Sequence, residues 1–170
     1  MRIVGGEWRG RTIKAPRGSL VRPTLDRVRE AWMSIVQMSL PGARVLDLFA
    51  GSGALGIEAL SRGASSAEFV DSDSRSLTVL RSNLEQLHAG SRATVTRADA
   101  LQFVASLPPD AYDVVFADPP YATDACIQLA ERWLKSPFSS VLGIEHARSV
   151  AMPAGGDTRR YGDSGVTFYR

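Results

Sequence analysis

Hydrophobic and polar positions follow two alternating patterns along most of this chain. Short runs of β-branched and aromatic residues are typical of buried strands, and between them apolar residues recur every three or four positions, as on one face of a helix. The predicted strands are "ARVLDLF", "AEFVD", "ATVTR", "YDVVFAD" and "SVLGIEH". Strands that alternate with helices in this way form a parallel sheet with helices on both faces.

Three further segments flank this series. Before it, "RPTLDRVREAWMSIV" predicts a helix with Leu25, Val28, Trp32 and Ile35 on one face. After it, "TRRYGDSGVTFYR" predicts an antiparallel hairpin, and the first residues, "RIVG" and "RTIKA" about "GEWRG", predict another. We therefore expect an α/β fold, a doubly wound and mostly parallel seven-stranded sheet with a C-terminal antiparallel hairpin and an N-terminal β-hairpin extension.

The loop "DLFAGSGALG" joins the first strand of the series to its helix. Gly51, Gly53 and Gly56 match the pattern G-x-G-x-x-G, and Asp71 lies 20 residues after Gly51, at the end of the next strand. This pattern is the fingerprint of a nucleotide-binding loop, in which glycine lets the backbone approach the ligand and the acid binds ribose hydroxyls. Two ligands fit the loop, NAD and S-adenosylmethionine.

The acids around this loop favour S-adenosylmethionine over NAD. S-adenosylmethionine has no phosphate, and Asp47, just before the glycines, suits its ammonium group. Asp99, at the end of the third strand, could accept a hydrogen bond from its adenine amine. A dehydrogenase would also need a substrate-binding portion that 170 residues hardly accommodate.

The loop "ADPPYATD" ends the fourth strand. In a sheet of order 3-2-1-4-5, the first and fourth strands are neighbours where the winding reverses, and ligands bind at their carboxyl ends. Asp118 and the Pro119 carbonyl could accept both N–H groups of a nucleobase amine, with Pro119 and Pro120 holding the backbone in place. Tyr121 offers a ring against which a flipped base can stack. Such chemistry needs neither a metal nor a covalent nucleophile.

Charge is unevenly distributed along the chain. Residues 1–30 contain eight Arg or Lys and three acids, a net charge of +5, whereas the other 140 residues contain twelve and fifteen, a net charge of −3. A basic arm of residues 1–22 on a domain of residues 23–170 indicates a polyanionic partner. We expect the folded core to survive deletion of residues 1–20. The expected RNA contacts are Arg2, Arg9, Arg11, Lys14, Arg17, Arg22 and Arg27, with Trp8 for stacking.

Two sets of motifs carry a resemblance to known families. "DLFAGSG" with "DPPY" resembles the S-adenosylmethionine-dependent amino-methyltransferases, which have the class I methyltransferase fold. The arm "MRIVGGEWRGRTIKAP" with "RPTLDRVREAW" resembles the RsmD family, which methylates guanine N2 in 16S rRNA. The resemblance implies that Asp118, Pro119, Pro120 and Tyr121 are catalytic. The implied cofactor contacts are Asp47, Phe49, Gly51, Gly53, Asp71 or Asp73, Asp99, Ala100 and Asp118.

The resemblance also implies a reaction and a partner. A methyl group would pass from S-adenosylmethionine, leaving S-adenosylhomocysteine, to a guanine of 16S rRNA in an assembled or assembling small ribosomal subunit. One cysteine, Cys126, and the lack of a long apolar run lead us to expect a cytoplasmic monomer without a membrane segment. The alternatives are a DNA adenine-N6 methyltransferase, a non-catalytic nucleic-acid-binding protein and a NAD-dependent oxidoreductase.

Overall fold

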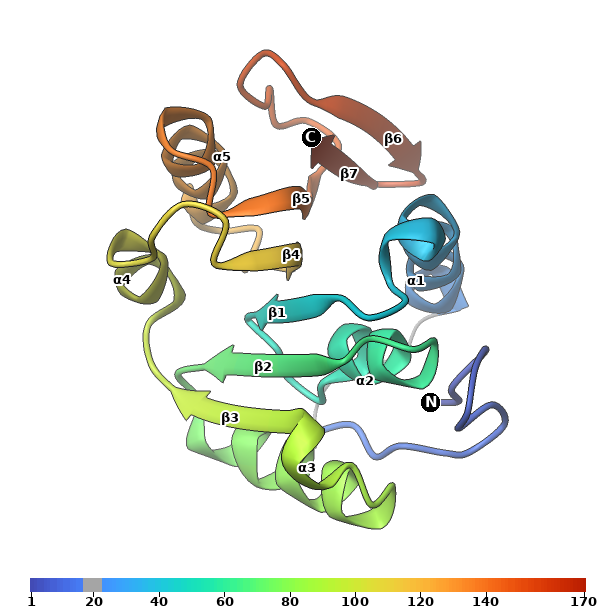
Figure 1. Cartoon of the computed structure of the whole chain (residues 1–170). Coiled ribbons are helices and arrows are strands. Elements are labelled where there is room, and N and C mark those ends of the chain that lie inside the picture. Colours follow the sequence, from blue (N-terminus) through green and yellow to red (C-terminus); the bar gives the residue numbers. More distant parts are fainter. Residues whose placement is uncertain (17–22) are drawn as a thin grey trace.

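Figure 1 shows the computed structural model, which describes residues 1–16 and 23–170. Seven strands form one sheet of order β3-β2-β1-β4-β5-β7-β6. The strands are β1 (Arg44–Leu48), β2 (Ser66–Asp71), β3 (Ala93–Arg97), β4 (Tyr112–Ala117), β5 (Ser139–Ala147), β6 (Asp157–Tyr161) and β7 (Ser164–Tyr169). The helices are α1 (Pro23–Val36), α2 (Ala54–Ser61), α3 (Ser74–Gln86), α4 (Ala100–Ala105) and α5 (Ala125–Lys135), with short 3-10 turns η1 (Gln37–Ser39) and η2 (Gly90–Arg92).

The pairing of the strands confirms the predicted sheet. Strands β1 to β5 pair in parallel, and β7 pairs antiparallel with both β5 and β6. Helices α1, α2 and α3 cover one face and α4 and α5 the other (Figure 1). Because successive side chains of a strand point to opposite faces, Val45 packs with the first group while Leu46 and Leu48 pack with the second. This burial on both faces explains why the central strands are mostly apolar.

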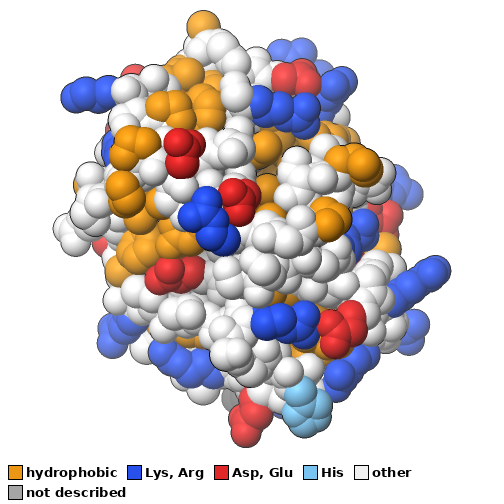
Figure 2. Space-filling view, in the orientation of Figure 1, with side chains coloured by type: hydrophobic (Ala, Val, Ile, Leu, Met, Phe, Trp, Pro, Cys, Tyr) orange, Lys and Arg blue, Asp and Glu red, His pale blue; other side chains and the backbone are white. Residues whose placement is uncertain are grey.

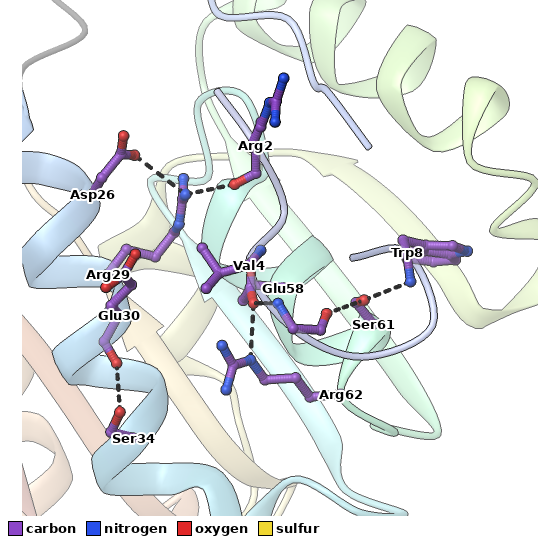
Figure 3. Close-up of polar contacts among 11 residues, drawn as sticks. Arg2, Val4, Trp8, Asp26, Arg29, Glu30, Ser34, Glu58, Ser61 and Arg62 are labelled. Atoms are coloured by element: carbon purple, nitrogen blue, oxygen red, sulfur yellow. Dashed lines mark hydrogen bonds and ion pairs between the residues drawn. The ribbon is translucent and has the colours of Figure 1, made fainter. Parts of the chain in front are cut away.

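The N-terminal arm, residues 1–16 as described, only partly forms the predicted hairpin. It reverses direction, and backbone hydrogen bonds join its two halves, from the Ile3 N–H to the Arg11 carbonyl at 3.0 Å and from the Ile13 N–H to the Met1 carbonyl at 2.9 Å. The described residues of the arm nevertheless form one isolated antiparallel bridge, between Arg2 and Thr12, rather than two strands. Other backbone groups of the arm bond to α2: the N–H groups of Val4 and Gly5 donate to the Glu58 carboxylate at 3.0 and 2.8 Å. The Trp8 N–H donates to the Ser61 hydroxyl at 2.9 Å (Figure 3). The arm therefore lies on the domain rather than extending from it.

The arm is also part of the hydrophobic core. Ile3, Trp8 and Ile13 are each 3% exposed and belong to the cluster beneath α1, α2 and α3. The guanidinium of Arg92 lies over the Trp8 ring, 4.9 Å from its centroid. The expectation that Trp8 stacks on RNA is therefore wrong, because its ring is buried and Arg92 already lies over it. The burial of these three side chains also argues against the expectation that the folded core survives deletion of residues 1–20.

A single buried side chain joins the arm to the glycine loop. The Asn83 amide, which is fully buried in α3, accepts from the Lys14 N–H and donates to the Lys14 carbonyl, both at 2.9 Å. It also donates to the Ser52 carbonyl at 3.0 Å. The arm and the loop that follows β1 are thus tied to the same helix.

Candidate functional site

A cavity of about 360 Å³ lies at the carboxyl ends of β1 and β4, where the winding of the sheet reverses. The Asp118 N–H donates to the Leu48 carbonyl at 3.5 Å, which brings the two predicted loops together. Helix α1 and the arm close the cavity from the side. Its lining residues are Met1, Ala15, Pro16, Asp26, Arg29, Trp32, Asp47, Phe49, Ala50, Gly51, Ser52, Ala54, Leu55, Ser76, Asp118 and Glu145.

The glycine loop wraps tightly around the start of α2. Phe49, Gly51 and Gly53 all have positive φ angles, of 56°, 54° and 82°. Such angles suit glycine but strain a bulky residue, so Phe49 is held there by its surroundings. A Cβ on Gly53 would come within 2.3 Å of the Leu80 side chain. The loop has no room for larger residues at this position, and its backbone faces the cavity.

The acids after β2 and β3 take different positions. Asp71 accepts from the Gly51 N–H at 2.8 Å and from the Asp73 N–H at 2.8 Å, so its carboxylate lies against the glycine loop. Asp73 instead caps α3 through the Arg75 N–H. Asp99 caps α4 and is exposed, and Ala100 is buried behind it. Of the predicted site residues, Asp47, Phe49, Gly51 and Asp118 line the cavity. The others lie outside its lining: Gly53, Asp71, Asp73, Asp99, Ala100, Pro119, Pro120 and Tyr121.

Asp47 is a buried acid at the base of the cavity. It is 2% exposed and accepts from the Gly56 N–H at 2.9 Å. Burial raises its pKa to about 8, the bond from Gly56 opposes the shift, and the nearby carboxylates of Asp118 and Asp71 add to it. A buried carboxyl with so high a pKa favours a cationic ligand group, which would restore its charged form.

Asp118 begins the second loop, opposite the glycines. The pKa of Asp118 is raised above the ordinary value of a carboxyl, mainly because the side chain is shielded from water in the cavity. The nearby Glu145 carboxylate adds to this shift. The residue as a whole is nevertheless exposed, so water still reaches it and limits the effect of burial. The Pro120 carbonyl accepts from the Thr123 N–H and hydroxyl. Among the described residues, none donates to the Pro119 carbonyl, which leaves this acceptor available.

The ring of Tyr121 lies at the surface, and hydrogen bonds of its hydroxyl fix its position. The side chain is 48% exposed, and the hydroxyl donates to Glu145 Oε1 at 2.8 Å and lies 2.6 Å from the Ser164 hydroxyl. Burial of the hydroxyl and its acidic neighbours raise the pKa of Tyr121, so it stays protonated. A fixed ring with an exposed face is suited to stacking with a planar ligand.

Sequence reasoning missed the part of the cavity contributed by α1 and β5. Arg29 is almost fully buried, donating to the Arg2 carbonyl at 2.7 Å and pairing with Asp26 at 3.2 Å (Figure 3). Its Nε and the indole N–H of Trp32 are buried without a hydrogen-bond partner in the described part of the chain. Glu145 is 4% exposed. The sequence signal for Glu145 was an acidic residue within a mostly apolar predicted strand, "SVLGIEH".

The expected RNA contacts are only partly described. Arg2, Arg9, Lys14 and Arg27 are exposed and Arg11 is half-buried, while Arg17 and Arg22 lie outside the described residues. Figure 2 shows basic side chains interspersed with acidic ones over the face seen in Figure 1, rather than one continuous basic patch. None of the helices in the described residues is long and apolar enough to cross a membrane.

Residues 1–170 match the family described as "Conserved hypothetical protein 95". YlbH of Bacillus subtilis, whose name assigns rRNA methylation only provisionally, is 38% identical over all of this chain and 98% of that protein. Ribosomal RNA small subunit methyltransferase D of Escherichia coli is 43% identical over 121 residues, which cover 71% of this chain and 60% of that protein. The chain belongs to the RsmD family.

The solved structures agree with the family in fold. YhhF from Escherichia coli superposes with a TM-score of 0.84 at 34% identity and covers 99% of this chain and 96% of its own. The sheet order and the helices on both faces are those of class I methyltransferases. In this chain the glycine loop and Asp118, the first residue of the "DPPY" loop, line one cavity.

Proposed function

We propose that this protein transfers a methyl group from S-adenosylmethionine to the N2 amine of a guanine in 16S rRNA. The observation that carries the proposal is the single cavity shared by the glycine loop after β1 and by Asp118 after β4. One loop is built for a nucleoside-containing cofactor and the other for a nucleobase amine. The name of the Escherichia coli relative supports the small ribosomal subunit as the substrate.

The cofactor would lie along the acids at the ends of β1, β2 and β3. Asp47 would hold its ammonium group, and Arg29, the guanidinium that lines the cavity, suits its carboxylate. Asp71 is the proposed ribose partner, because its carboxylate lies against the glycine loop, whereas the carboxylate of Asp73 caps α3. Asp99 would reach the adenine from outside the described cavity, with Ala100 beside it. When bound, the cofactor supplies an activated methyl group on a sulfonium.

The target base would lie between Tyr121 and the cofactor. Asp118 and the Pro119 carbonyl would accept hydrogen bonds from the two N–H groups of the amine and turn its nitrogen lone pair toward the methyl group. Pro119 and Pro120 restrict the backbone that presents these acceptors. Tyr121 would stack on the base, worth roughly 1–3 kcal/mol. Positioning of this kind supplies most of what transfer from a sulfonium requires.

The affinity for S-adenosylmethionine should depend on the protonation of Asp47. With a pKa of about 8 in the free protein, Asp47 must lose a proton before it can pair with the ligand's ammonium. Affinity should therefore rise by up to about tenfold per pH unit from pH 6 toward 8. It should fall above pH 8, where the ammonium of the ligand, with a pKa of about 8, loses its proton.

Calorimetric titrations between pH 6 and 9 would measure this dependence, and two buffers of different ionisation enthalpy would count the protons released. Asp47→Asn is the matched variant: it should bind the cofactor more weakly and lose the rise below pH 8. An affinity for the wild-type protein that stays constant from pH 6 to 8 would contradict the assignment.

The exposed basic residues of the arm should contribute salt-dependent affinity for RNA. Each phosphate neutralised on single-stranded RNA adds a slope of roughly −0.7 to the plot of log affinity against log salt. Replacing Arg2, Arg9 and Lys14 together by Gln should flatten the slope by about 2. Filter binding of 16S rRNA over a salt series would measure it. Arg159→Gln with Arg160→Gln, on β6 at the other edge of the sheet, is the control. Equal slopes would show that RNA is bound elsewhere.

Nucleoside mass mapping tests the proposed function directly. Small-subunit RNA from a strain that lacks this protein should miss one N2-methylguanosine, and the purified protein with S-adenosylmethionine should restore it. Formation of N6-methyladenine in DNA would instead favour a DNA methyltransferase. Cofactor binding without transfer to either nucleic acid would favour a non-catalytic binding protein.

A further inference from the structure

Glu145 is a buried carboxylate within the cavity that the proposed chemistry has not used. It is 4% exposed, and burying a charge without partners costs several kcal/mol. The Tyr121 hydroxyl donates to Oε1 at 2.8 Å, whereas no described residue donates a hydrogen bond to Oε2. One oxygen of this carboxylate is therefore held by the protein while the other is available to a ligand.

The register of the sheet places Glu145 beside Asp118. Ala117 of β4 pairs with Ile144 of β5, so Asp118 and Glu145 occupy the next position on adjacent parallel strands. Parallel strands lie roughly 4.8 Å apart, and residues in register point to the same face. Both side chains line the same cavity, and Glu145 contributes to the raised pKa of Asp118. The cavity thus presents two adjacent hydrogen-bond acceptors, the carboxylates of Asp118 and Glu145, and suits a ligand with two adjacent hydrogen-bond donors.

Guanine and adenine differ at this point. The base-pairing edge of guanine carries two neighbouring donors, N1–H and the N2 amine. Adenine carries its N6 amine beside N1, which has a lone pair and no proton. A carboxylate only accepts hydrogen bonds when it is ionised, so the pair matches the edge of guanine and opposes the N1 of adenine when both Asp118 and Glu145 are ionised in the complex.

We propose that Glu145 accepts a hydrogen bond from N1–H of the target guanine while Asp118 holds its N2 amine, so that the pair selects guanine over adenine. This inference rests on the proposed function. Glu145 is then a specificity-determining residue, and Tyr121 has two tasks: its ring stacks on the base, and its hydroxyl orients the carboxylate that reads N1.

The analogue 2-aminopurine separates this role from a purely structural one. It has the same amine at C2 as guanine but a lone pair at N1. After mapping has identified the methylated guanine, small-subunit RNA can be assembled by ligation with either base at that position. The wild-type protein should methylate guanine faster, because the N1 lone pair of 2-aminopurine faces the Glu145 carboxylate.

Glu145→Gln should reverse this preference in part. The glutamine oxygen can still accept a hydrogen bond from Tyr121, which turns its NH2 group toward N1 of the base. This NH2 group repels the N1–H of guanine but can donate a hydrogen bond to the N1 lone pair of 2-aminopurine. The ratio of the guanine rate to the 2-aminopurine rate should fall by roughly 10- to 100-fold, with cofactor affinity within about twofold of wild type. Glu131→Gln, the same change on the exposed side of α5, should leave the ratio unchanged.

Each outcome decides between the two roles. An unchanged ratio in Glu145→Gln would overturn the proposal and leave Glu145 as a support for Tyr121. Loss of activity on both bases with the cofactor still bound would also overturn it. If the variant does not fold, the wild-type protein still decides, because equal rates on the two bases would exclude a contact with N1–H. If the wild-type protein and S-adenosylmethionine form no N2-methylguanosine in RNA that was unmodified at the start, the proposed function itself would be contradicted.

Discussion

Asp118→Ala is expected to lose methyl transfer by roughly a hundredfold or more while binding S-adenosylmethionine about as well as the wild-type protein. The carboxylate is the acceptor assigned to the target amine, and it has no assigned contact with the cofactor's ammonium or ribose. Its removal should slightly lower the pKa of Asp47, because the two carboxylates repel one another. Near neutral pH this change would favour cofactor binding rather than weaken it.

Single-turnover rates on small-subunit RNA and cofactor affinity by calorimetry separate the two effects. Asp163→Ala is the matched control, because Asp163 is exposed in the turn between β6 and β7. Near-normal turnover in Asp118→Ala would remove this carboxylate from the mechanism. A parallel loss of cofactor affinity would mean that Asp118 holds the cofactor instead.

Trp8→Ala is expected to destabilise the whole protein by about 3–5 kcal/mol. The Trp8 ring is 3% exposed, lies in the main core cluster and is covered by Arg92. Its loss leaves a cavity between the arm and the domain that neighbouring side chains cannot fill without shifting. Deletion of residues 1–16 should be more severe, because it also removes the backbone donors of Glu58.

Urea unfolding followed by circular dichroism would measure the loss of stability. The adjacent variant Arg9→Ala alters an exposed side chain of the same arm and should change the free energy of unfolding by less than about 0.5 kcal/mol. A Trp8→Ala protein as stable as the wild type would show that the arm folds as an independent appendage, as its charge alone had indicated.

The sheet was predictable because its information is local. Each of the first five strands is a short run rich in apolar or β-branched residues that ends at a turn, and the winding of doubly wound sheets then predicts the order of these strands. The placement of Asp47, Gly51 and Asp118 around one cavity followed from that order, since each residue ends or follows a central strand.

The burial of the arm and the role of β5 were not predictable in the same way. The stretch "GEWRG" has the glycines and charges of an exposed turn, and the residues that contact Trp8, Ser61 on α2 and Arg92 in η2, lie far along the chain. Glu145 stood out in an apolar strand, but only the register between β4 and β5 places it beside Asp118. Contacts between distant segments decide both cases.

The attachment of the arm limits how readily it could be transferred to another protein. The carboxylate of Glu58, the hydroxyl of Ser61 and the amide of Asn83 all serve backbone groups of the arm. At Gly6 a Cβ would come within 1.7 Å of the Ser61 carbonyl, so no side chain can enter there. An arm grafted onto another domain would therefore need equivalent polar partners at these three helix positions to be held in the same way.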